Sequence, residues 1–100
     1  MEFKSFMKEA LQEARNAGSQ GEVPVGAVIV RKGVIVAQAG NRTRELADPT
    51  AHAEMLVIRA ACIAVGSQRL PGYDLYVTLE PCAMCAAAIA AARINRLYYG

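Results

Sequence analysis

The sequence predicts an α/β fold, a three-layer sandwich in which helices cover both faces of a β-sheet. Segments whose apolar residues recur at helical spacing alternate with short β-branched segments, in the order αββαβαβ along 100 residues. Helical segments join the later strands, as in crossovers between parallel strands. Two polar motifs stand where a strand or loop passes into a helix, the usual ligand-binding edge of such a sheet. The length suits a single domain, residues 1–100.

The first half of the chain predicts a helix followed by a β-hairpin. We expect the helix over 2–17, ending before Gly18, because apolar residues recur there on one helical stripe: Phe3, Phe6, Met7, Ala10, Leu11 and Ala14. Two apolar runs separated by a short turn predict strands at 25–31 and 34–40. Gly26 permits close approach of the backbone, either to a ligand or to a tightly packed helix.

The second half predicts two further helix–strand units after a polar loop. We expect a helix over 51–65, buried on most sides because few of its residues are charged. Alternating apolar residues predict a strand at 74–79, and Pro81 suits the start of a helix over 81–93. A last strand begins near Leu97.

Composition limits the class of protein. The chain is 54% hydrophobic, yet it holds no apolar run of the roughly 18 residues that a membrane-spanning helix needs. The N-terminus lacks the basic-then-apolar order of a signal peptide, so we expect a soluble, intracellular protein. The net charge of +2 is compatible with a nucleic-acid partner and equally with an ordinary solvated surface. An odd count of three cysteines indicates free thiols or metal ligands.

Two short motifs form the candidate site. His52 and Glu54 make an H-x-E motif, and Pro81 precedes Cys82 and Cys85 in a P-C-x-x-C motif. This combination is the known signature of zinc-dependent nucleobase deaminases. Thiols at i and i+3 share one helix face, about 5–6 Å apart at their Cβ atoms, and can reach one ion.

Three ligands indicate a catalytic rather than a structural metal. With Cys82, Cys85 and His52 bound, a tetrahedral zinc ion keeps one open position. We expect one Zn²⁺ with a bound water or hydroxide, whose pKa zinc lowers to about 7. Glu54 is not a ligand, and a carboxylate in an apolar helix is costly without compensation. It is therefore the candidate catalytic residue that moves protons between the water and the base.

These residues have other interpretations. A C-x-x-C pair alone also occurs in redox proteins, although thioredoxin-like sites have a different βα context. A closed structural zinc site would need a fourth ligand. Cys62 lies about 15 Å along the helix from His52, too far to share its ion, and is assigned to the core.

The extended motifs carry a resemblance to a known family. Residues 48–54 (Asp-Pro-Thr-Ala-His-Ala-Glu) and 78–85 (Thr-Leu-Glu-Pro-Cys-Ala-Met-Cys) resemble the tRNA-specific adenosine deaminases of the cytidine-deaminase-like superfamily. Residues 22–28 (Glu-Val-Pro-Val-Gly-Ala-Val) and Asn41 also match that pattern. The similarity runs through essentially the whole chain, so the fold class expected is the cytidine-deaminase-like αβα sandwich.

The resemblance implies a function and a set of site residues. It implies a cytoplasmic hydrolase that converts the wobble adenosine of a tRNA anticodon stem-loop to inosine, with no DNA substrate expected. Asn41 would hydrogen-bond the flipped base, Ala53 would supply a backbone contact and Val25 would pack against the ring. Glu80 would support the site from behind the catalytic groups. The family acts as a homodimer whose partner subunit helps to build the RNA surface.

One departure from the family leaves alternatives open. Family members continue past Gly100 with a further strand and C-terminal helices, so we expect a C-terminally truncated domain whose last strand is an exposed edge. The alternatives are a deaminase of a free base or nucleoside (guanine, cytosine or adenosine), and an inactive zinc-bound fragment or partner subunit.

Overall fold

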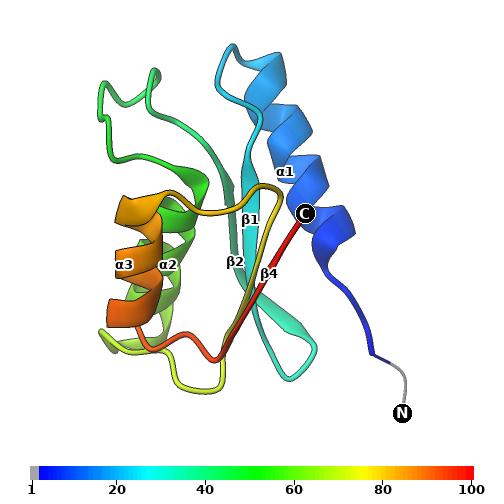
Figure 1. Cartoon of the computed structure of the whole chain (residues 1–100), viewed down its shortest axis with the longest axis vertical. Coiled ribbons are helices and arrows are strands. Elements are labelled where there is room, and N and C mark those ends of the chain that lie inside the picture. The colour runs from blue at the N-terminus through cyan, green and yellow to red at the C-terminus, as the bar shows by residue number, and fades with distance from the viewer. Residues whose placement is uncertain (1–2) are drawn as a thin grey trace.

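The computed structural model describes residues 3–100 and confirms the expected order of elements. In chain order they are α1 (Met7–Ser19), β1 (Gly26–Arg31), β2 (Val34–Gly40), α2 (Ala53–Val65), β3 (Asp74–Val77), α3 (Ala83–Ala91) and β4 (Arg96–Tyr99). Figure 1 shows three layers, with α1 on one face of the sheet and α2 and α3 together on the other. The expected αβα sandwich is therefore correct.

The sheet brings the two motif-bearing connections to one edge. Its strand order is β2-β1-β3-β4, with β1 antiparallel to both neighbours and β3 parallel to β4. Strands β2 and β3 thus run in the same direction on either side of β1. The chain leaves β2 at Gly40 and β3 at Val77 on the same edge, and each connection leads into the N-terminus of a helix. This topology places residues that are 30 positions apart in sequence side by side.

Strand β1 is buried on both faces and joins two hydrophobic layers. Ala27 and Ile29 pack in the layer beneath α2 and α3, whereas Val28 and Val30 pack with Phe6 and Ala10 beneath α1. Alternate side chains of a strand point to opposite faces, so a continuous apolar run is what a central strand requires. Four of these β1 side chains are at most 4% exposed.

Gly26 is explained by helix packing. A Cβ atom at this position would lie 2.0 Å from the carbonyl oxygen of Ala10 and 2.5 Å from the backbone nitrogen of Ala14, both on α1. The glycine lets α1 approach the sheet closely, and a Cβ there would point at the helix. The alternative that Gly26 faces a ligand is therefore wrong.

Several predicted boundaries are wrong by a few residues. Of the predicted helix over 2–17, residue 2 lies outside the described residues and residues 3–6 are not helical. Phe3 fits the helical spacing but is 66% exposed and contacts the Tyr98 ring at 5.5 Å between centroids. Both site helices start two residues later than predicted, at Ala53 and Ala83, and β3 ends two residues early.

Helix α2 is less buried than its composition indicates. It buries one stripe against the sheet, while Ile63 is 82% and Val65 is 38% exposed. Helix α3 likewise leaves most of its alanines exposed and buries Cys85 and Ile89. The apolar outer face of this helical layer therefore lies on the molecular surface. Within residues 3–100, no helix has the length and apolar character needed to cross a bilayer.

Candidate functional site

The first two candidate ligands occupy equivalent positions at the starts of two helices. His52 is the N-cap of α2 and Cys82 is the N-cap of α3, both with extended backbone dihedrals. Their carbonyl groups accept the first helical hydrogen bonds, from the N–H groups of Leu56 at 3.0 Å and Ala86 at 2.8 Å. N-caps are normally Ser, Thr, Asp or Asn, whose side chains bond the helix backbone. Here, among the described residues, neither side chain makes a capping bond, and both turn toward each other instead.

The three ligand atoms have the separations of a tetrahedral zinc site. Nδ1 of His52 lies 3.5 Å from Sγ of Cys85 and 3.8 Å from Sγ of Cys82. All three atoms lie within 4.8 Å of one another, and the cysteines are free thiols. Zn–S and Zn–N bonds of about 2.3 and 2.05 Å at tetrahedral angles give an S···N separation of roughly 3.6 Å. The group therefore suits one Zn²⁺ held through Nδ1, and the structure brings together the three residues that the sequence indicated.

The two thiols lie in different electrostatic surroundings, and a bound cation stabilises the thiolate form of both. Burial and then the neighbouring negative charge of Glu54 raise the pKa of Cys85, with a further contribution from Cys82. The backbone N–H of Cys85 lowers the pKa of Cys82, at the positive end of α3. A divalent cation among these groups offsets the repulsion between thiolates and carboxylate, and a coordinated thiol is deprotonated. The chemistry of the donor set thus fits zinc.

Glu54 is buried beside the three candidate ligands but is not one of them. It is the second residue of α2 and is 4% exposed. Its side chain lies close enough to Cys85 to influence that thiol. It also lines a pocket of about 250 Å³ together with His52 and Cys82. A carboxylate at this place can exchange protons with a molecule that fills the pocket.

The walls of this pocket contain two of the three substrate-binding candidates. Asn41 and Val25 both line it, and both are at least nine-tenths buried. The side-chain oxygen of Asn41 accepts a hydrogen bond from the backbone N–H of Ala53 at 2.7 Å. The Asn41 NH₂ group therefore points away from the Ala53 N–H, and within residues 3–100 it has no acceptor of its own. Ala53 itself is fully buried, and its N–H group is already used.

The remaining pocket residues were not all found from the sequence. Val23, Thr43 and Leu79 line the pocket as well; Val23 and Leu79 lie within the quoted family motifs but were not singled out, and Thr43 lies in a loop without a motif. For Thr43, the one signal in the sequence is its position two residues after Asn41, a predicted substrate contact. Glu80 also lines the pocket and is exposed, so it lies at the rim.

The sequence matches a known family along its whole length. A family model described as the cytidine and deoxycytidylate deaminase zinc-binding region matches residues 1–100. Among curated proteins, the tRNA-specific adenosine deaminase of Agrobacterium fabrum is 68% identical over 95 residues, or 95% of this chain and 62% of the relative. A protein with the same description from Bacillus subtilis is 52% identical and is covered over 59% of its length. The chain thus spans about three fifths of these relatives.

Solved structures of two kinds of deaminase superpose on the fold. A structure from studies of A-to-I editing by tRNA:A34 deaminases at the wobble position of transfer RNA has a TM-score of 0.93 and 68% identity. The superposition covers 95% of this chain and 73% of that one. A guanine deaminase from Bacillus subtilis has a TM-score of 0.94 and 40% identity, covering 100% of this chain and 64% of that chain.

Proposed function

The chain belongs to the family of the cytidine and deoxycytidylate deaminase zinc-binding region, and from this we propose that it deaminates the wobble adenosine of tRNA to inosine by zinc-dependent hydrolysis. The observation that carries the proposal is the pairing of a three-ligand group with a buried, non-ligand carboxylate in one base-sized pocket. The 68% identity to a tRNA-specific adenosine deaminase supports the choice of substrate.

His52, Cys82 and Cys85 are the proposed zinc ligands. When bound, zinc supplies Lewis-acid chemistry that lowers the pKa of water to about 7. The chain's part is to fix the ligand geometry, which it does by seating two ligands at helix N-caps and the third one turn into α3. The positive ends of α2 and α3 both point toward the site and favour negative charge there.

Glu54 is the proposed catalytic acid and base. It takes one proton from the attacking water and delivers it to the ring nitrogen, and it then takes the second proton from the hydroxyl added at C6 and delivers it to the amino group. The C–N bond then breaks, ammonia leaves, and the oxygen of the water remains on the base. Proton transfer by a positioned side chain contributes typically 10²–10⁴-fold to a rate.

The pocket supports recognition of a single extruded base. A volume of about 250 Å³ lies just below the range of about 300–1,000 Å³ for sites of drug-sized ligands, which suits a single base. A base inside a stem-loop must therefore flip out to enter. Asn41 is proposed to donate its free NH₂ group to the base, and Val25 to pack against the ring. In the structure the N–H of Ala53, at the start of α2, donates to Asn41.

A second copy of the chain is the proposed partner besides tRNA. The outer face of the α2–α3 layer is apolar and exposed, including Ile63 at 82% exposure and the alanines of α3. Apolar patches of this kind mark protein–protein interfaces.

Three free thiols are typical of a reducing compartment, which supports the proposal of a cytoplasmic protein.

A second candidate is the deamination of free guanine. It is favoured by one observation, the superposition of a guanine deaminase on the whole chain with a TM-score of 0.94. The zinc group and the acid serve both reactions, so the walls of the pocket decide between them.

The discriminating experiment compares substrates on one zinc-loaded preparation. We expect inosine at the wobble position of an anticodon stem-loop, at a kcat/KM well above that for guanine, free adenosine or cytidine. Release of ammonia from guanine with the stem-loop unchanged would exclude tRNA as the substrate and favour the second candidate.

A further inference from the structure

A buried glutamate outside the catalytic motifs holds the loop that carries part of the pocket wall. Glu22 lies in the connection between α1 and β1 and is only 6% exposed. Its two carboxylate oxygens accept hydrogen bonds from the backbone N–H groups of Arg44 at 3.1 Å and Glu45 at 2.9 Å. The hydroxyl of Thr43 donates a third bond at 3.4 Å. These bonds join segments 21 to 23 residues apart.

The loop between β2 and α2 has a second contact with the same connection. The guanidinium of Arg44 donates to the carbonyl oxygen of Gly21 at 3.0 Å. Bonds within the loop hold its shape, among them Asp48 N–H to the Thr43 carbonyl at 3.0 Å. The loop is therefore a folded unit, and Gly21 and Glu22 attach its segment 43–45 to the connection before β1.

This loop contributes both a predicted contact and an unforeseen one to the pocket. It begins at Asn41, whose amide faces the pocket, and two residues later Thr43 lines the same wall. Thr43 is also the residue whose hydroxyl bonds Glu22. A change at Glu22 is thus transmitted to the pocket wall through one side chain.

The carboxylate is suited to this task because it is charged at neutral pH despite its burial. Burial opposes ionisation of Glu22, but the hydrogen bonds from the backbone of Arg44 and Glu45 outweigh it and lower its pKa below the ordinary 4.5. Hydrogen bonds to a charged acceptor are about twice as strong as neutral ones.

We propose that Glu22 is a positioning residue that fixes Thr43 against the substrate base and thereby sets base binding rather than the chemical step. Asn41, beside it, is held separately by its bonds to Val25 and Ala53. Glu22 does not line the pocket and lies outside the zinc group. Its effect falls on KM and on discrimination between bases, with kcat largely retained. This role rests on the proposed function, since it assumes that a base fills the pocket.

The test is Glu22→Gln in the zinc-loaded, full-length protein, which keeps the size of the side chain but removes its charge and one acceptor. The matched control is Glu45→Gln, which breaks the exposed Arg42–Glu45 ion pair in the same loop. We expect hydrogen exchange at the Arg44 and Glu45 amides to accelerate about tenfold in Glu22→Gln only. We also expect KM for the stem-loop to rise about five- to tenfold, with kcat within about twofold and an unchanged zinc content.

The two readouts separate this proposal from the proposed function. Amide exchange needs no substrate, and if the wild type acts on guanine instead of the stem-loop, the same KM comparison is made with guanine. The positioning role would be overturned if Glu22→Gln left hydrogen exchange at both amides unchanged. It would also be overturned if exchange became faster while KM stayed the same. Should Glu22→Gln not fold, Arg44→Ala removes the bond to Gly21, and the same two amides must then exchange faster than in the control.

Discussion

The substitution Glu54→Gln separates the acid from the metal group. Glutamine has nearly the size of glutamate, so the 4%-exposed position at the second residue of α2 remains filled. The change removes a buried negative charge beside Cys85 and leaves all three proposed ligands in place. We therefore expect the zinc content to match the wild type and the melting temperature to be no lower.

The expected kinetic effect is large because the role proposed for Glu54 is proton transfer in the reaction itself. Loss of a positioned acid or base typically costs 10²–10⁴-fold, which corresponds to about 2.7–5.4 kcal/mol in the activation barrier. The assay measures single-turnover deamination of an anticodon stem-loop over a range of pH, with metal content measured on the same samples. Glu13→Gln is the matched control, since Glu13 lies on α1 across the sheet from the site.

Two results would refute this reasoning. A Glu54→Gln protein with full zinc and a kcat/KM within about threefold of the wild type would show that the proton transfers are made elsewhere. A protein that loses zinc in proportion to its activity would show that Glu54 supports the metal rather than the reaction.

Other substitutions test the metal group, the packing and the pH dependence. Cys85→Ser should lose most of the bound zinc and lower the melting temperature, whereas Cys62→Ser should retain zinc; equal loss in both would contradict the ligand assignment. Gly26→Ala forces a Cβ against backbone atoms of α1 and should lower the free energy of unfolding by about 1–3 kcal/mol in urea titrations; an unchanged midpoint would contradict the close packing. Hydrogen bonds from the hydroxyl and then the backbone N–H of Thr50 lower the pKa of Asp48 below 3.8, so its contribution to stability is present above that pH and is lost as the pH falls through the lower value. In acid titrations, stability should therefore fall less steeply in Asp48→Asn than in the wild type.

The sequence predicts the fold well because its periodicities are strong and agree with each other. The run from Val25 to Val30 is apolar at every position except Gly26, and only a strand covered on both faces buries such a run. Residue spacing also identified His52, Cys82 and Cys85, since metal ligands must be of particular residue types. Side-chain character alone could not show that two of them replace the usual N-cap residues and so shift each helix start.

The pocket wall could not be predicted in the same way. Thr43 and Leu79 have no chemistry that singles them out, and they reach the pocket only through the folding of their connections. Glu22 was visible as part of a family pattern, but its bonds to Arg44 and Glu45 span more than 20 residues and follow no periodicity. The exposure of Ile63 was missed because composition cannot tell a buried helix from one with an apolar outer face.

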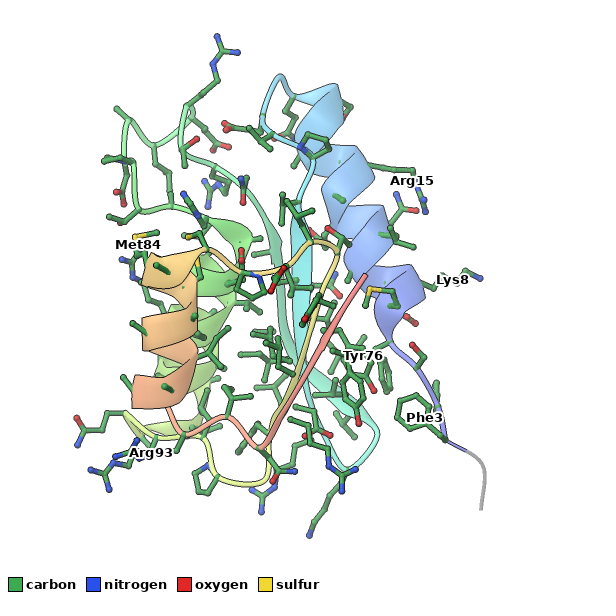
Figure 2. The ribbon with its side chains drawn as sticks, in the orientation of Figure 1. Phe3, Lys8, Arg15, Tyr76, Met84 and Arg93 are labelled. Carbon is green, nitrogen blue, oxygen red and sulfur yellow. The ribbon has the colours of Figure 1, made fainter. Side chains whose placement is uncertain are left out.

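In Figure 2 the labelled Met84 marks the start of α3, the helix whose N-cap Cys82 has its Sγ 3.8 Å from Nδ1 of His52 at the start of α2. The most direct test of the account is X-ray absorption at the zinc edge of the purified protein. We predict one zinc ion per chain with two sulfur neighbours at about 2.3 Å and two nitrogen or oxygen neighbours at about 2.0–2.1 Å. A four-sulfur shell, a shell without sulfur, or a protein that binds no zinc would contradict a catalytic centre built from His52, Cys82 and Cys85.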